Sequence, residues 1–422
     1  MPRRPIVEKL VDIQRYAEQL LALLADATRL RLRADVPVGA YLSGGLDSTV
    51  VAALARQYTN RLETFSVRFE DTTLDEGDFQ HEAVRFLGTS HREIFCSGGE
   101  IGRVFPEVIA HAEKPIVRTA PAPLYLLARL VRDCGYKVVL TGEGADEMLG
   151  GYDIFKEVKV RRFCSAHPES KLRPLLLRRL YPYLPGVQSQ PTPWLNAFFR
   201  AGVADLQAPF FSHLPRWQLT SRMKALFSDD VKAELHSHDS CGDMLALLPE
   251  SFSAWDPFAR AEYLESRHLL PGYILSSQGD RVAMAHAVEA RYPFLDHRVV
   301  EFASRLPRGL KMRTLQEKYL LKQCAAQLAP PRIIARKKQP YRAPDARSFF
   351  GVHPPAYVGA LLSPSQLRND GIFRPEAVQK LVAKAENGGL AGVGDNMAFV
   401  GILSTQLLIH TLIHNFSEVH SI

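Results

Sequence analysis

The stretch Val36-Pro-Val-Gly-Ala-Tyr-Leu-Ser-Gly-Gly-Leu-Asp-Ser-Thr-Val-Val-Ala-Ala-Leu-Ala-Arg56 decides the fold. Its first part, up to Leu42, is apolar and predicts a buried strand, and residues 46–56 predict a helix. Between and just inside these elements lie two hydroxyls, two glycines and a carboxylate: Ser43, Gly44, Gly45, Asp47 and Ser48. Glycines let the backbone approach an anion closely, and the free N–H groups at the start of a helix bind it.

Asp47 adds a carboxylate that repels a bound phosphate unless a cation lies between them. A Mg²⁺ ion removes that repulsion, because it takes oxygen ligands from both a carboxylate and a phosphate. The stretch therefore predicts a site for a nucleotide phosphate with its metal ion. An ordinary Ser/Gly turn is the alternative interpretation.

Composition places the 422 residues among ordinary globular proteins, with an apolar fraction of 46% and a charged fraction of 23%. The net charge of +7 suits phosphate-bearing ligands but is too diffuse to indicate nucleic acid. The five cysteines have no CxxC spacing, which predicts reduced thiols and no zinc site. We find no signal-peptide core and no apolar run approaching bilayer length. These features predict a soluble, cytoplasmic enzyme that contacts neither nucleic acid nor membrane.

Strand and helix patterns alternate over the first third of the chain, which predicts an α/β fold with a doubly wound parallel sheet and a largely helical second half. Predicted strands cover 36–42, 62–69, 91–95 and 137–140, and predicted helices cover 6–34, 46–56, 75–87, 100–112 and 122–133. We expect four parts: an N-terminal helical segment at 1–34, a nucleotide-binding core at 35–156, a helical insertion at 157–255 and a helical remainder at 256–422. Basic clusters such as Arg161-Arg162 are interpreted as solvated helix faces.

A second polar cluster, Thr141-Gly-Glu-Gly-Ala-Asp-Glu147, directly follows the predicted strand at 137–140. Ligands of parallel sheets lie at the carboxyl ends of the strands, so this turn and the first one should meet there. Asp146 is our candidate for a second Mg²⁺ ligand beside Asp47. A helix N-terminus enriched in acids is the alternative, because acids there stabilise the helix dipole.

Two later clusters mix charged and apolar residues. Asp280-Arg281 leads into Val288-Glu-Ala-Arg-Tyr-Pro-Phe-Leu-Asp296, where Glu289 is the candidate for touching substrate and a buried salt-bridge network is the alternative for the other charges. Arg336-Lys-Lys-Gln-Pro-Tyr-Arg-Ala-Pro-Asp345 has the composition of a surface loop. A flexible ammonium in such a loop could also stabilise an adenylate and its departing pyrophosphate.

Together these motifs carry a family resemblance. Ser43-Gly-Gly-Leu-Asp-Ser48 resembles the pyrophosphate loop of N-type ATP pyrophosphatases. With the second cluster, the Val288–Asp296 stretch and Arg336-Lys-Lys338 in the same order, roughly residues 30–345 resemble the synthetase domain of the asparagine synthetase and β-lactam synthetase family. The resemblance implies the adenine nucleotide hydrolase-like fold, ATP and Mg²⁺.

The resemblance also implies roles for individual residues. It places the adenosine against Leu42, Val67, Thr141 and Gly142, and the pyrophosphate against Ser43, Gly45, Asp47 and Ser48. It implies Asp47 and Asp146 as Mg²⁺ ligands, and Glu143 in activating the acid. It implies Glu289 near the acceptor, and Lys338 in stabilising the transition states. Arg118, in Val117-Arg-Thr-Ala-Pro-Ala-Pro123, resembles a segment beside the acceptor pocket, and Asp280 is a further substrate candidate.

One departure concerns nitrogen supply. Glutamine-dependent members of the family begin with Cys directly after Met, ahead of a glutaminase domain, whereas Pro2 follows Met1 here. We therefore expect no glutamine hydrolysis by this chain alone. The amine would come from an amine-bearing substrate, from ammonia, or from a separate glutaminase or biosynthetic partner.

The sequence thus predicts an ATP-dependent carbon–nitrogen ligase that adenylates a carboxylic acid and transfers the acyl group to an amine, with release of AMP and pyrophosphate. An intramolecular amide or lactam synthetase fits the motifs equally well. A catalytically silent partner of a separate amidotransferase and a tRNA-modifying pyrophosphatase are further alternatives. A homodimer is compatible with all of these.

Overall fold

The structure is a computed structural model that describes residues 6–200, 206–351, 354–390 and 392–415. The chain divides into two compact units, each built from three segments. The first comprises Met1–Cys96, Pro123–Lys156 and Glu262–Pro340, and the second comprises Ser97–Ala122, Glu157–Ala261 and Tyr341–Ile422.

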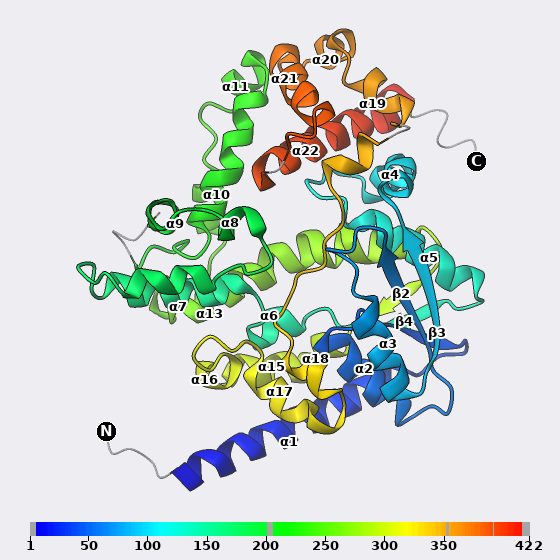
Figure 1. The fold of residues 1–422 in the computed structure, drawn as a ribbon, viewed down its shortest axis with the longest axis vertical. Helices are drawn as coiled ribbons and strands as arrows, with labels where there is room; N and C mark the ends of the chain where they lie inside the picture. The colour runs from blue at the N-terminus through cyan, green and yellow to red at the C-terminus, as the bar shows by residue number, and fades with distance from the viewer. Residues whose placement is uncertain (1–5, 201–205, 352–353, 391, 416–422) are drawn as a thin grey trace. The chain divides into compact units, whose positions relative to one another are not determined.

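The first unit contains a five-stranded sheet in which every neighbouring pair is parallel. Its order is β3 (Ser90–Cys96), β2 (Glu63–Phe69), β1 (Val38–Tyr41), β4 (Val138–Leu140) and β5 (Glu289–Arg291) (Figure 1). The α/β class and the parallel sheet that the sequence predicted are confirmed. The three-residue strand β5 was not predicted.

The strand order reverses beside β1. The chain adds β2 and β3 on one side of β1, and then adds β4 and β5 on the other side. Neighbouring connections therefore leave β1 and β4 in opposite directions, and in open parallel sheets ligands bind outside the carboxyl ends of the strands at such a point. Both predicted glycine turns, after Leu42 and after Leu140, lie at these ends.

The helices of the first unit have these bounds: α1 Ile6–Arg31, α2 Leu46–Arg56, α3 Gly77–Leu87, α6 Ala145–Leu149, η4 Glu265–Ile274, η5 Ser276–Asp280, α14 Arg281–Met284, η6 Pro293–Leu295, α15 His297–Arg305, α16 Arg308–Lys311, α17 Tyr319–Cys324, η7 Ala325–Gln327 and α18 Pro331–Ala335. The predicted helix at 46–56 has the same bounds as α2. Gly88 ends α3 in the left-handed conformation (φ 61°).

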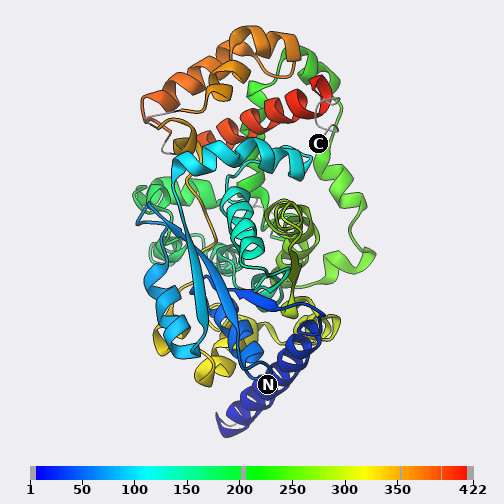
Figure 2. The same ribbon diagram turned by 90° about the vertical axis from the view of Figure 1, so that its right-hand side faces the viewer.

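A hydrophobic core covers one face of this sheet. Its members are buried side chains of α1, α2, α15 and α17 together with alternate residues of β1 and the end of β4, including Leu20, Leu24, Ala40, Leu42, Val50, Leu54, Leu140, Val299, Leu320 and Leu321. α1 lies against α2, α15 and α17 (Figures 1 and 2). Phe65 points to the opposite face and packs edge-on against Tyr136 (centroids 5.3 Å apart). β1 (Val-Gly-Ala-Tyr) has no charged residue, as expected of a strand covered on both faces, whereas β2 alternates polar with apolar residues.

The second unit is helical. Its elements are α4 Gly98–Ala112, η1 Arg173–Arg179, α8 Pro185–Gln188, α9 Thr192–Phe199, α10 Leu214–Ser221, η2 Arg222–Leu226, α11 Asp229–Glu234, α12 Ser240–Ala246, η3 Glu250–Ala254, η8 Ala346–Phe349, α19 Ala356–Leu361, α20 Pro364–Asp370, α21 Pro375–Glu386, α22 Val393–Ile409 and η9 His410–His414. Three helices carry the chain between the units: α5 Pro121–Asp133, α7 Asp153–Ser165 and α13 Pro257–Leu264.

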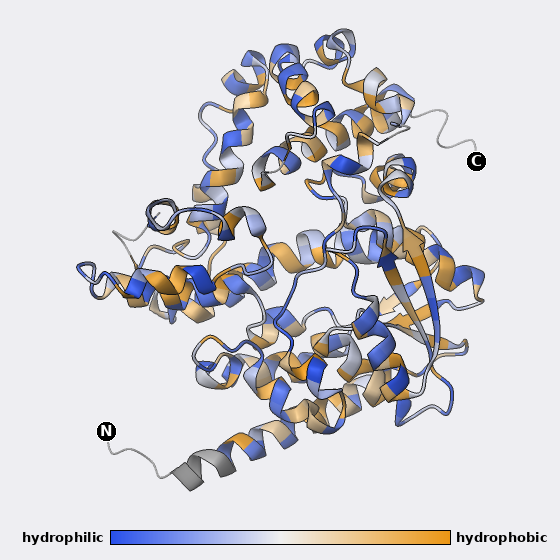
Figure 3. Ribbon diagram, viewed as in Figure 1, coloured by the Kyte–Doolittle hydropathy of each residue, from blue (hydrophilic) through white to orange (hydrophobic). Residues whose placement is uncertain are grey.

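Two expectations for this unit are corrected. Arg161 does not lie on a solvated face: its side chain is 1% exposed, pairs with Glu157 (3.0 Å) and stacks on Phe211. The expectation about apolar runs is also wrong, because Val393–His414 is long and apolar enough to cross a membrane by length and composition. Figure 3 shows its hydrophobic residues in orange. Half of the apolar part of this helix is buried, and the ring of Phe399 packs on that of Phe349 (centroids 5.6 Å apart). The core helix of a globular protein would have the same length, composition and burial.

Candidate active site

The first glycine turn joins β1 to α2. Gly44 has a left-handed backbone (φ 73°), and a Cβ there would lie 2.7 Å from both Phe79 Cβ and Gln80 N. The two serine hydroxyls of the turn lie 3.0 Å apart, and Ser48 Oγ accepts a hydrogen bond from the N–H of Ser43. The turn is therefore held in shape by its own hydroxyls before any ligand binds, with the N-terminus of an eleven-residue helix directly behind it.

The second turn, after β4, lies against the first. A Cβ on Gly142 would be 3.0 Å from both Asp47 Cβ and Ser48 N, a tighter contact than most Cβ atoms make, so a glycine suits this close approach. The N–H of Thr141 donates to the carbonyl of Arg291 in β5, which continues the sheet pairing one residue beyond β4. The parallel sheet thus brings together two turns that are about a hundred residues apart in the sequence.

Asp47 and Asp146, the two predicted metal ligands, both contact the ammonium group of Lys318. The ammonium of Lys318 lies 2.5 Å from Asp47 Oδ2 and 2.5 Å from Asp146 Oδ1. The ammonium of Lys338 lies 2.5 Å from Asp146 Oδ2 and 3.8 Å from Asp47 Oδ2. Burial opposes ionisation of Asp146, but the two lysines outweigh it and hold the pKa of this carboxyl below its usual range.

This arrangement fits a Mg²⁺ ion bound together with phosphates. Oδ1 of Asp47 is buried and has no hydrogen-bond partner among the described residues, so it is available as a ligand. Among the residues that the structure describes, no group of three or more His, Cys, Asp or Glu side chains could hold a metal ion. Mg²⁺ is commonly held by one or two carboxylates plus substrate phosphates and water, which matches what Asp47 and Asp146 offer.

Glu317 supports the lysine loop, and sequence reasoning missed it. Its carboxylate accepts hydrogen bonds from the backbone N–H of Lys338 (3.2 Å) and the ammonium of Lys322 (3.0 Å), and it pairs with Lys156 (2.9 Å). Burial alone would raise its pKa, but Lys156 and Lys322 lower the pKa to about 2. Only the position of Glu317-Lys318 directly before the apolar run Tyr319–Leu321 hinted at a buried role.

A second polar group lies at the ends of β1, β4 and β5. Tyr292 Oη donates to Asp280 Oδ1 (2.6 Å), and burial, this hydrogen bond and the charge of Glu143 raise the pKa of Tyr292. Burial also raises the pKa of Glu143. Oε2 of Glu143 and Oη of Tyr41 are buried without a hydrogen-bond partner in the described chain. Tyr41, Glu143, Asp280 and Tyr292 thus form one polar cluster.

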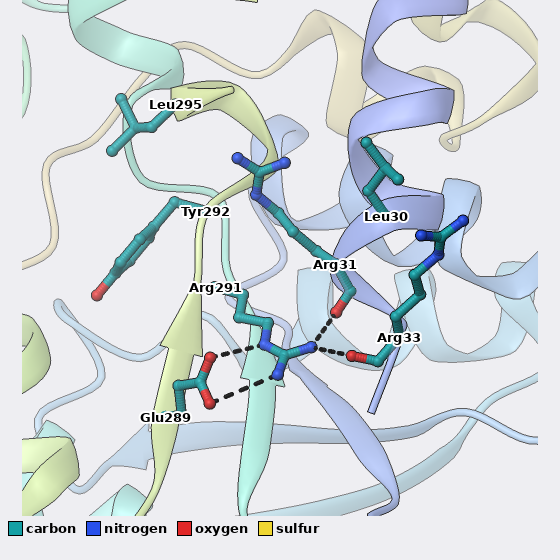
Figure 4. Close-up of a pocket in the computed structure, with 7 residues that line it drawn as sticks. All are labelled: Leu30, Arg31, Arg33, Glu289, Arg291, Tyr292 and Leu295. Atoms are coloured by element: carbon teal, nitrogen blue, oxygen red, sulfur yellow. Dashed lines mark hydrogen bonds and ion pairs between the residues drawn. The ribbon is translucent and has the colours of Figure 1, made fainter. Parts of the chain in front are cut away.

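Glu289 lies at the other end of β5. It pairs in register with Val138, the first residue of β4, whereas the glycine turn follows the last residue of that strand. Its side chain is 56% exposed and forms an ion pair with Arg291 (2.8 Å), which also donates to the backbone carbonyls of Arg31 and Arg33 (Figure 4). These groups line a cavity of about 520 Å³ with Leu30, Tyr292 and Leu295.

Two further predicted site residues, Val67 and Arg118, belong to different units of the chain. Val67 lies near the carboxyl end of β2, where its carbonyl accepts a hydrogen bond from Gln80 (2.9 Å). Arg118 belongs to the second unit and pairs with Asp345 (3.0 Å), which also accepts the N–H of Thr119. Its relation to an acceptor pocket stays a prediction.

Comparison with known proteins agrees with this geometry. A family model described as asparagine synthase matches residues 19–408. The chain belongs to the asparagine synthase family. A Bacillus subtilis protein named asparagine synthetase (glutamine-hydrolyzing) 1 is 29% identical over 76% of this chain and 48% of its own length. A Mycobacterium tuberculosis protein that carries the provisional name of a glutamine-hydrolyzing asparagine synthetase is 32% identical over 79% of this chain and 49% of its own.

A third relative bears a different name. The Penicillium rubens protein Amidase chyE is 28% identical over 86% of this chain and 57% of its own length. The chain thus spans about half the length of the curated relatives that it matches. The family resemblance that the four motifs predicted is confirmed.

Glu317→Gln should lower the free energy of unfolding at neutral pH and should make it depend less on pH in the acid range. A carboxyl whose pKa falls from 4.5 to about 2 on folding contributes stability above pH 4.5, and loses it as the pH falls toward 2. The shift corresponds to about 3 kcal/mol in the free energy of unfolding. Urea unfolding of both proteins at several pH values from 7 to 3 should show the difference in their free energies of unfolding shrinking below about pH 4.5.

Glu301→Gln is the matched control, because this carboxylate is 62% exposed and lies 3.8 Å from its partner Arg305. It should change the free energy of unfolding by less than about 1 kcal/mol. A difference between wild type and Glu317→Gln that stays constant over this pH range would contradict the buried, ionised Glu317.

Proposed function

We propose that the chain catalyses ATP-dependent amide bond formation through an acyl-adenylate. The observation that carries this proposal is the pair Asp47 and Asp146, which converge on one ammonium group at the carboxyl ends of β1 and β4. Family membership and the reversal of strand order at this point support a nucleotide there. We further propose that the sheet is that of the N-type ATP pyrophosphatases.

In the first step, an oxygen of the carboxylic acid forms a bond to the α-phosphorus of ATP as the bond to pyrophosphate breaks. The adenosine would lie along Leu42, Val67, Thr141 and Gly142, and the phosphates at the Ser43–Ser48 turn. Mg²⁺, when bound at Asp47 and Asp146, would neutralise phosphate charge. Lys338 would stabilise the negative charge that develops on the phosphates, because its ammonium already lies at this turn.

In the second step, an amine nitrogen forms a bond to the acyl carbon, the bond to AMP breaks, and the amine gives up a proton. We propose that Glu143 takes this proton, since its raised pKa makes its carboxylate the stronger base. Tyr292 and Asp280 would orient the amine. Glu289 lies at the opposite end of β5 and is engaged by Arg291, a geometry that favours Glu143 for this role.

The amine and the compartment belong to the same proposal. The amine would come from a substrate that carries it, from ammonia, or from a separate glutaminase, and an intramolecular amine would use the same steps. A cytoplasmic location is supported by the use of ATP and by the five cysteines, all of which are free thiols in the structure.

Lys338→Ala should lower the rate of pyrophosphate release at least about a hundredfold, a loss of about 3 kcal/mol in transition-state stabilisation. A screen of amino acids and other carboxylic acids with ATP and Mg²⁺ first identifies an acid that triggers pyrophosphate release by wild type. The variant is then measured with that acid, and its ATP affinity is measured separately by equilibrium binding, where we expect little change.

Lys337→Ala is the control, because the neighbouring side chain is exposed. It should keep most of the activity. An equal loss in both variants would show that general positive charge matters and that Lys338 has no specific role. Pyrophosphate release that no acid stimulates would contradict the proposed function itself.

Glutamine should not serve as the sole nitrogen source for this chain. With ATP, Mg²⁺ and the matching acid, we expect glutamate to stay at the level of a protein-free control. Addition of an amine or of a glutaminase partner should start steady AMP production. Sustained glutamate formation by the purified 422-residue chain would overturn this prediction.

A further inference from the structure

Lys318 was not singled out in the sequence, yet its ammonium lies between the two carboxylates proposed to hold the metal ion. It is 2.5 Å from an oxygen of each, and its side chain is 3% exposed. Lys338 is the second cation at this place and is 24% exposed. Two carboxylates and two ammonium groups form a set with no net charge.

The chain is shaped to keep Lys318 there. Its backbone has φ 49°, in the left-handed region that residues other than glycine seldom adopt. Strained positions of this kind persist where the surrounding structure requires them. Gly151 leaves the space for this contact, because a Cβ there would be 2.3 Å from Lys318 Cε and 1.9 Å from Asp146 Oδ1.

We propose that Lys318 is an internal counter-cation of the metal site. It neutralises Asp47 and Asp146 when no nucleotide is bound, and it moves onto the polyphosphate when Mg²⁺ arrives with ATP. The inference rests on the proposed function, since it takes these two carboxylates as the ligands of the metal ion of ATP. Lys318 is a positioning residue in this account and takes no part in bond making.

The physical reason is charge balance in a buried site. Two adjacent carboxylates without a cation would be costly to bury, so the empty site needs an ammonium. Free Mg²⁺ entering alone would leave Lys318 beside a divalent cation with no new anion to pair with. ATP brings phosphate oxygens that accept the displaced ammonium. Binding of metal and nucleotide are therefore coupled, each raising the affinity for the other.

Mn²⁺ alone tests the inference, with the fraction of free Mn²⁺ followed by electron paramagnetic resonance. Wild type should bind Mn²⁺ weakly without nucleotide. Lys318→Met keeps an unbranched side chain, shorter only by the terminal nitrogen, and removes its charge, and should bind Mn²⁺ alone at least about tenfold more tightly. Lys318→Arg should restore the wild-type weakness. With a non-hydrolysable ATP analogue, wild-type protein should lower the fraction of free Mn²⁺ below the value that the same concentration of analogue gives without protein.

Lys311→Met is a matched control, because Lys311 is also a buried lysine, paired with Glu262 (2.8 Å). Its Mn²⁺ affinity should equal that of wild type. Equal Mn²⁺ affinity of wild type and Lys318→Met would overturn the inference and leave the proposed function standing. Absence of Mn²⁺ binding even with the analogue would overturn both.

Circular dichroism checks that each variant is folded. If Lys318→Met does not fold, the inference is tested by Mn²⁺ binding to the wild-type protein with and without the analogue. Wild type that binds Mn²⁺ only after the analogue is added supports the inference. Wild type that binds Mn²⁺ equally well with and without the analogue overturns it.

Discussion

The constraint on which the site depends is the convergence of two carboxylates on shared cations at one edge of a parallel sheet. Asp47 and Asp146 follow β1 and β4, which are neighbours in the sheet although they are distant in the chain. Parallel pairing places the ends of both strands at the same edge, and glycines at both turns allow the turns to touch. Lys318 and Lys338, from later segments of the chain, then balance the negative charge of the two adjacent carboxylates.

Much of this arrangement could be predicted from local sequence. The apolar run ending at Leu42, the glycine turn and the helix at 46–56 each follow from periodicity and from turn chemistry, and α2 has the predicted bounds. Asp146 could be chosen because carboxylates directly after a buried strand are unusual. These features depend on residues within about ten positions of one another, which is the range over which sequence patterns carry information.

The parts that could not be predicted depend on contacts across long stretches of chain. Lys318 meets Asp47 across 271 positions, and only the apolar run that follows Glu317-Lys318 distinguishes this pair from a solvated charged pair. β5 has three residues, two of them charged, so no alternation reveals it. Its direction nevertheless determines the chemistry, because it carries Glu289 away from the glycine turns and brings Tyr292 toward Asp280 and Glu143.

The most direct test of the central claim is the position of a metal ion bound with nucleotide. Crystals grown with Mn²⁺ and a non-hydrolysable ATP analogue would locate the ion by its anomalous scattering. We predict a peak within coordinating distance of both Asp47 and Asp146, with phosphate oxygens completing the ligands of the metal ion. A bound nucleotide whose metal ion contacts neither carboxylate, while the lysines remain paired with them, would contradict it.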